Sequence, residues 1–145
     1  MSKVVPLFRA SASAKLLLLN CDHELGRAAV ALDPADRYIA AHLAAVHAAC
    51  AFVDLINGKA KGPKPNIWGQ LVALNREWLP WATYFSAGSR LRRELEMGAP
   101  VAAAVADEMT VSAEDFRDEI AMAIDPASQW PTRPISSQLE LRLAS

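Results

Sequence analysis

The sequence is poor in cysteine, in long apolar runs and in net charge. Two cysteines in 145 residues, Cys21 and Cys50, are too few for a secreted scaffold held together by disulfides. The leucine run Leu16–Leu19 is far shorter than the roughly 18 apolar residues that cross a membrane. Residues 1–11 show no long apolar stretch and no clear cleavage site of a signal peptide. We therefore expect a cytoplasmic protein without a membrane partner.

The formal net charge is −1, so there is no overall basic excess of the kind that indicates nucleic-acid binding. The charge is unevenly distributed along the chain. Residues 1–98 hold 12 basic and 8 acidic side chains, whereas residues 99–125 hold one basic and seven acidic ones. Such a segment is typical of a solvated acidic helix face. It also fits an acidic surface that meets the basic region of another subunit.

Several catalytic signatures are missing. The chain has no glycine-rich phosphate-binding loop, no HExxH pattern and no GxSxG pattern. Aspartate and glutamate are plentiful, but none is convincingly paired with a base or a nucleophile. The sequence motifs therefore point to no particular class of reaction.

Alanine dominates what is present, with 28 of 145 residues, and stretches of strand-like alternation are nearly absent. This composition favours helix. Start and stop signals predict helices over residues 13–31, 34–57, 67–78, 80–97, 100–108 and 112–124. We therefore predict an all-α, antiparallel helical bundle of four to five main helices as one domain over residues 1–125. An extended, proline-containing C-terminal tail is expected over residues 126–145.

The helix over residues 34–57 is the clearest of these. Asp33 and Pro34 form a typical start, and Gly58 a typical stop. Helical spacing places one set of apolar side chains on a single face: Ile39, Leu43, Val46, Cys50 and Val53. A narrow polar stripe lies opposite: Asp36, His47 and Asp54. A helix that is apolar around most of its girth should lie at the centre of the bundle or at a subunit contact.

Three segments resemble an actinobacterial family of small HEPN-domain proteins. The segment Arg37–Ala45 (RYIAAHLAA) is similar to the first core helix of that family. Trp68 with Leu71 resembles the next helix, and Trp78–Phe85 (WLPWATYF), followed by Gly88, resembles the one after it. The similarity covers residues 33–97, and the helix over 112–124 matches only in type. It implies a compact α-helical bundle, frequently a homodimer, in a superfamily named for nucleotide binding.

Many members of the wider superfamily are metal-independent ribonucleases. They carry an arginine and a histidine four to six residues apart, near the start of a later helix and facing a dimer cleft. There the arginine would hold a phosphate and the histidine would assist proton transfer at a ribose hydroxyl. Arg37 and His42 have this spacing but lie in the early core helix, and no histidine follows Trp68.

Helical geometry also separates this pair. Five residues along a straight helix place two side chains roughly 140° apart. His42 falls on the apolar face near Val46 and Val53, whereas Arg37 projects elsewhere. We therefore predict that His42 is a hydrogen-bonded, neutral histidine in the core or at an interface. The alternative is a ribonuclease that uses Arg37 and His42, with His47 as a possible third group.

A metal site is a further candidate, because Cys21, His23, His47 and Cys50 are all residue types that bind zinc. His47 and Cys50 are three residues apart and could share a metal. Cys21 and His23 lie about 200° apart on a helix and could not. We expect both cysteines to behave as small buried apolar side chains, and we predict neither a metal nor another cofactor.

An anion-binding patch for phosphate or RNA is predicted from seven basic residues: Lys59, Lys61, Lys64, Arg76, Arg90, Arg92 and Arg93. Trp68, Trp78 and Trp81 could offer stacking surfaces beside it, although aromatic side chains at helical spacing are usually buried. The sequence as a whole predicts a non-catalytic, homodimeric HEPN-like interaction module. It would bind a partner protein or a nucleotide or RNA ligand.

Overall fold

The computed structural model describes residues 12–57 and 66–125, and within them it is an all-α bundle. Its elements are α2 (Ala12–Val30), α3 (Pro34–Asn57), α4 (Ile67–Leu74), the short 3₁₀ turn η1 (Arg76–Trp78), α5 (Leu79–Glu96) and α6 (Ala103–Ile124). The predicted fold class is therefore confirmed. The predicted tail over residues 126–145 lies outside the described residues.

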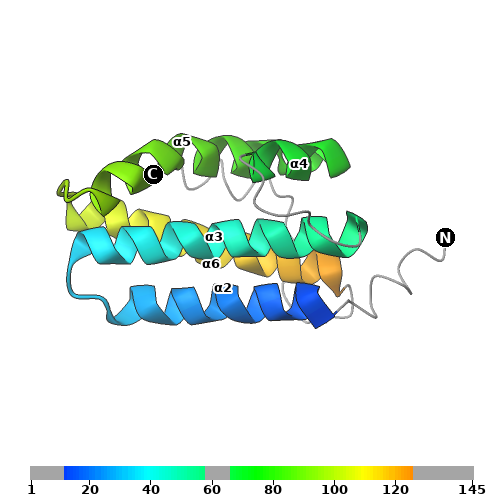
Figure 1. Cartoon of the computed structure of the whole chain (residues 1–145), viewed down its shortest axis with the longest axis horizontal. Helices are drawn as coiled ribbons and strands as arrows, with labels where there is room; N and C mark the ends of the chain where they lie inside the picture. The colour runs from blue at the N-terminus through cyan, green and yellow to red at the C-terminus, as the bar shows by residue number, and fades with distance from the viewer. Residues whose placement is uncertain (1–11, 58–65, 126–145) are drawn as a thin grey trace.

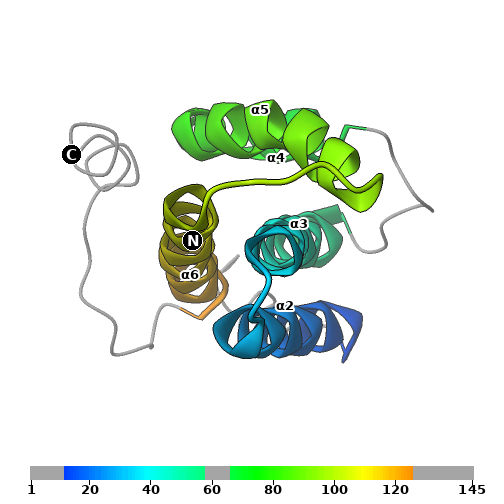
Figure 2. The ribbon, with the colours of Figure 1, turned by 90° about the vertical axis from the view of Figure 1, so that its left-hand side faces the viewer.

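The helices form three layers (Figures 1 and 2). Helix α2 forms one outer layer, α3 and α6 lie side by side in the middle, and α4 and α5 form the other outer layer. Helices α2 and α5 run one way along the long axis, and α3 and α6 run the other way (Figure 1). Successive long helices are thus antiparallel, as short connections require.

Alanine explains how α3 fits at the centre. Six alanines of α3 have no exposed surface: Ala41, Ala44, Ala45, Ala48, Ala49 and Ala51. Small side chains let helix axes approach closely, and α3 packs extensively against both α2 and α6. By length and composition alone α3 could also cross a membrane, but 61% of its most apolar 18-residue window is buried inside the bundle.

The side chains that helical spacing places on one apolar face of α3 differ in how deeply they are buried. Of its five members only Val53 is buried, whereas Ile39, Leu43, Val46 and Cys50 are half-buried. Six of the seven residues of α3 that have no exposed surface are alanines, and the seventh is His42. On the polar stripe opposite, Asp54 is buried, with 3% of its surface exposed.

Two predicted helix boundaries were wrong. The helix predicted over residues 67–78 ends at Leu74, because Asn75 adopts extended backbone and its side chain caps η1 by accepting from the Glu77 amide. The two helices predicted over residues 100–108 and 112–124 are one continuous helix, α6. Ser112, the first residue of the second predicted helix, does not cap α6. It is fully buried, and its hydroxyl donates to the Tyr84 hydroxyl at 3.1 Å.

Candidate functional site

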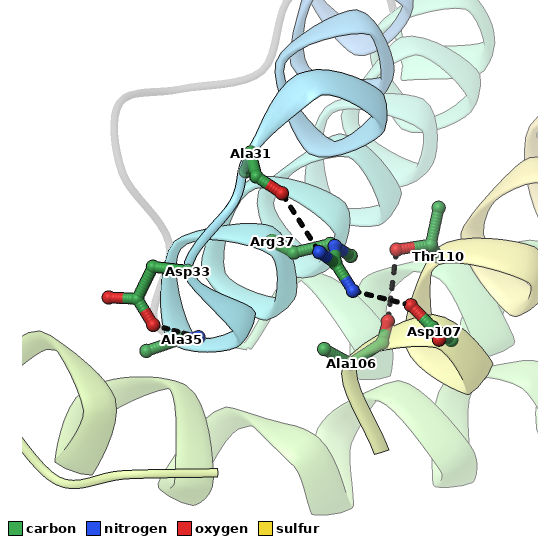
Figure 3. A network of polar contacts seen from close by, with 7 residues as sticks. All are labelled: Ala31, Asp33, Ala35, Arg37, Ala106, Asp107 and Thr110. Atoms are coloured by element: carbon green, nitrogen blue, oxygen red, sulfur yellow. Dashed lines mark hydrogen bonds and ion pairs between the residues drawn. The ribbon is translucent and has the colours of Figure 1, made fainter. Parts of the chain in front are cut away.

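Arg37 lies in the first turns of α3, and its side chain links α3 to the residue after α2 and to α6 (Figure 3). Its Nη1 lies 2.6 Å from Oδ1 of Asp107 on α6, and its Nη2 donates to the Ala31 carbonyl at 2.9 Å. That carbonyl follows the last residue of α2, Val30. The guanidinium therefore satisfies a free carbonyl at the end of α2 and fixes the connection between α2 and α3 against α6.

His42 lies in a different environment. Its side chain has no exposed surface, and its Nε2 lies 2.8 Å from the Phe85 carbonyl of α5. Burial is the main reason that its pKa is lowered from 6.5 to about 4. The imidazole is therefore neutral at physiological pH, with its proton on Nε2 and donated to Phe85. Its buried Nδ1 has no hydrogen-bond partner within the described part of the chain.

Tyr38 and Gly88 are neighbours of His42 where α3 contacts α5. The Tyr38 ring stacks on the imidazole with an interplanar angle of 4°, and its hydroxyl donates to the Gly88 carbonyl at 3.2 Å. A Cβ at Gly88 would lie 2.7 Å from the Tyr38 hydroxyl oxygen and 3.4 Å from Cδ2 of His42. Gly88 is thus the position where α5 approaches α3 closely. Burial raises the pKa of Tyr38 to about 12, so the hydroxyl keeps its proton.

The two members of the sequence-predicted ribonuclease pair are not brought together. Arg37 contacts the end of α2 and the start of α6, whereas His42 contacts α5. A general base must reach the proton that it removes, and a fully buried imidazole whose Nε2 is already bonded does not face solvent. His47 is half-buried, and its buried Nδ1 has no hydrogen-bond partner among the described residues.

The predicted anion-binding patch is not one surface among the described residues. Arg76 lies in η1, before the start of α5, and Arg90 lies 14 residues further, roughly 21 Å along the helical rise. Arg90 pairs with Glu94 at 3.3 Å and Arg92 with Glu96 at 3.1 Å, so two of the cations are matched by anions. Lys59, Lys61 and Lys64 lie outside the described residues.

Arg93 differs from its neighbours because no ion pair of its side chain occurs in the described segments. Together with Arg90, Glu94, Met97 and Ala99 it lines an open hollow at the end of α5. The carbonyls of the last turn of α5 point toward this end and oppose anion binding there. The hollow is therefore a weak candidate for a phosphate site.

The tryptophans belong to the core. Trp68, Trp78 and Trp81 are at most 7% exposed, and each ring lies within 6 Å of the Phe116 ring centroid. They therefore stabilise the bundle and offer no stacking surface for bases.

The four candidate zinc ligands, Cys21, His23, His47 and Cys50, do not gather into a site. Cys21 is fully buried on α2, and burial raises the pKa of its thiol to about 12, whereas His23 on the same helix is exposed. Cys50 is half-buried on α3, and burial raises its thiol pKa too. No group of three or more metal-binding side chains occurs among residues 12–57 and 66–125.

Glu119 is a residue that the sequence did not single out. It is half-buried on α6, its Oε2 is buried without a hydrogen-bond partner among the described residues, and burial followed by the nearby Asp118 carboxylate raises its pKa to about 7. No local sequence signal marks it, because its burial depends on how α6 packs.

We expect Glu119→Gln to stabilise the protein at pH 8. The folded pKa of Glu119 lies above the unfolded value of 4.5, so its ionisation removes stability as the pH rises from 4.5 through about 7. After allowance for partial exposure, the gain in the free energy of unfolding should be about 1–2 kcal/mol at pH 8. Urea denaturation of both proteins at pH 4 and pH 8 measures it. An equal difference at both pH values would contradict this prediction.

Comparison with known families supports the resemblance seen in the sequence. A model of the SAV_6107-like HEPN family matches residues 28–121. This range extends beyond residues 33–97 and includes most of α6, which the sequence alone matched only in type. No curated protein and no solved structure matches the chain.

Proposed function

The chain belongs to the SAV_6107-like HEPN family, and from that premise we propose that it is a non-catalytic interaction module. In this proposal the protein acts in the cytoplasm as a homodimer. It binds a partner protein in preference to a nucleotide or RNA ligand.

One observation carries the non-catalytic part. The arginine and histidine with ribonuclease spacing, Arg37 and His42, are both used in the internal packing of the bundle. Residues committed to holding α3 against α2, α5 and α6 are not free to bind a phosphate and transfer a proton at the same time.

The choice of ligand class depends on the arrangement of charge. Nucleic-acid binding needs several cations that neutralise neighbouring phosphates. Among the described arginines, Arg90 and Arg92 are paired with glutamates and Arg76 lies at the other end of α5. On α6 the exposed acidic side chains include Glu108 and Glu114, whereas Asp107 is matched by Arg37. This arrangement favours a protein partner with a basic surface.

We expect the purified protein to cleave none of a varied set of single-stranded and hairpin RNAs in the absence of added metal. We also expect RNA binding weaker than about 10⁻⁴ M at physiological salt, as measured by fluorescence anisotropy. Sedimentation velocity at micromolar concentration should show a dimer.

A different experimental result would contradict each part of the proposal. Metal-independent cleavage that disappears in both Arg37→Ala and His42→Ala, with helical content retained, would favour the ribonuclease alternative. Tight RNA binding that weakens steeply with salt would reverse the choice of ligand class. A monomer at micromolar concentration would overturn the dimer.

A further inference from the structure

Two connections at one end of the bundle present large apolar side chains to solvent. Leu32, between α2 and α3, is 94% exposed, and Met97, directly after α5, is 89% exposed. Val30, the last residue of α2, is 77% exposed, and every other large apolar residue in the described part of the chain is 62% exposed or less. Both connections lie at the end drawn on the left in Figure 1, and Figure 2 views that end directly. We call Val30, Leu32 and Met97 the apolar tip.

The connection between α2 and α3 does not depend on the Leu32 side chain. Before Leu32, the Ala31 carbonyl accepts from Nη2 of Arg37 at 2.9 Å, and after it, Oδ1 of Asp33 accepts from the Ala35 amide at 3.1 Å (Figure 3). Polar contacts therefore hold the backbone on both sides of the exposed leucine. An apolar side chain on a backbone that is already fixed loses less conformational entropy when a partner covers it.

The end of α5 is also closed without the Met97 side chain. The amides of residues 97–99 donate to carbonyls of residues 93–95, and Gly98 has a φ of 103°, which is typical of such a helix end. Met97 and Ala99 are then free to line the open hollow of about 510 Å³, together with Arg90, Arg93 and Glu94. This hollow offers apolar surface beside the Arg93 guanidinium and has room for a leucine side chain.

Two charged side chains at this end have no ion pair among residues 12–57 and 66–125, and they are opposite in sign. Arg93 lies beside the hollow, and Asp36 lies in the first turn of α3, just after the connection that carries Leu32. The neighbouring Arg37 differs, because Asp107 already matches its charge. A surface that contacts a second copy of itself about a two-fold axis must carry both signs of charge. This end of the bundle meets that condition.

We propose that two copies of this chain meet end to end through the apolar tip, with Leu32 of each copy in the hollow beside the partner's Met97. This inference rests on the proposed function, because it names the surface through which the homodimer forms. A two-fold axis midway between Leu32 and the hollow lets each copy insert one leucine and receive one. Arg93 then faces the partner's Asp36, and the two form the ion pair that neither makes within its own chain.

The first test compares Leu32→Glu with Leu79→Glu by sedimentation equilibrium of the full-length protein. Leu79 is 45% exposed at the start of α5, roughly 27 Å along the helix from Met97, and is the matched control. We expect Leu32→Glu to raise the dimer dissociation constant about 10-fold or more, and Leu79→Glu to change it by less than about threefold. Circular dichroism should show equal helical content, because both side chains are exposed.

The second test reverses the two charges. Arg93→Glu and Asp36→Arg should each raise the dimer dissociation constant about threefold or more, because each places like charges opposite one another across the contact. The double variant restores opposite charges and should return the constant to within about threefold of the wild-type value. Damage to the fold by either substitution would add in the double variant instead of cancelling. A double variant that dimerises less than both single variants would overturn the end-to-end arrangement.

The remaining outcomes separate this inference from the proposed function. A wild-type dimer that Leu32→Glu leaves intact would overturn the tip contact while the homodimer stands. A wild-type monomer at micromolar concentration would overturn both. Equal loss of the dimer in Leu32→Glu and Leu79→Glu would show that the added charge does not act at the tip, and it would overturn the tip contact as well.

Discussion

Replacing Phe116 with alanine is expected to lower the free energy of unfolding by about 3–5 kcal/mol, the range for large aromatic side chains in well-packed cores. Phe116 has no exposed surface and lies between the layers. Its ring centroid is 5.1 Å from that of Phe85 and 5.6 Å from that of Trp81. Removing it would leave a cavity lined by large rings that cannot collapse without moving α5 against α6.

Urea denaturation followed by tryptophan fluorescence measures this loss, because Trp68, Trp78 and Trp81 all contact Phe116. The midpoint should fall while the slope of the transition is unchanged. Phe52→Ala is a useful control, since Phe52 is 8% exposed and has a ring contact only with Trp78 among the described aromatic pairs. Phe52→Ala should lower the free energy of unfolding clearly less than Phe116→Ala does. A loss below 1 kcal/mol for Phe116→Ala would mean that the aromatic cluster is not the core.

Local signals in the sequence predicted most of the fold. Asp33 and Pro34 set the start of α3, as predicted. Asn66 caps α4 by accepting from the Gly69 amide at 2.9 Å. These features are local, because each depends on residues within one helical turn.

Features that depend on tertiary packing could not be predicted from the sequence. Hydropathy ranks Ile39 and Leu43 above alanine, so it cannot show that six of the seven residues of α3 without exposed surface are alanines. Ser112 has the pattern of a cap and instead bonds Tyr84 from inside a helix. The burial of His42 followed from helical phase, whereas its acceptor, the Phe85 carbonyl 43 residues away, did not.

Lowering the pH from 7 to 4 is expected to destabilise the protein through His42 by roughly 3 kcal/mol. The pKa of His42 is about 4 in the folded state and 6.5 in the unfolded chain. As the pH falls, the unfolded chain therefore binds the proton first. The stability that the neutral imidazole provides is fully present above pH 6.5. It is lost as the pH falls from 6.5 toward 4, the window in which only the unfolded state is protonated.

His42→Leu isolates this effect, because every other titrating group is common to both proteins. Leucine fills a similar volume, and the Phe85 carbonyl keeps the Ser89 hydroxyl as a donor at 3.4 Å. We therefore expect the two proteins to differ by no more than about 1 kcal/mol at pH 7. At pH 4 the variant should be the more stable one by roughly 2–3 kcal/mol.

Chemical denaturation at half-unit pH steps measures the difference between wild type and His42→Leu. A difference that stays constant from pH 7 to pH 4 would mean that His42 can be protonated inside the folded bundle. The imidazole would then have access to water and to a proton acceptor, and the argument against a catalytic role for His42 would lose its basis.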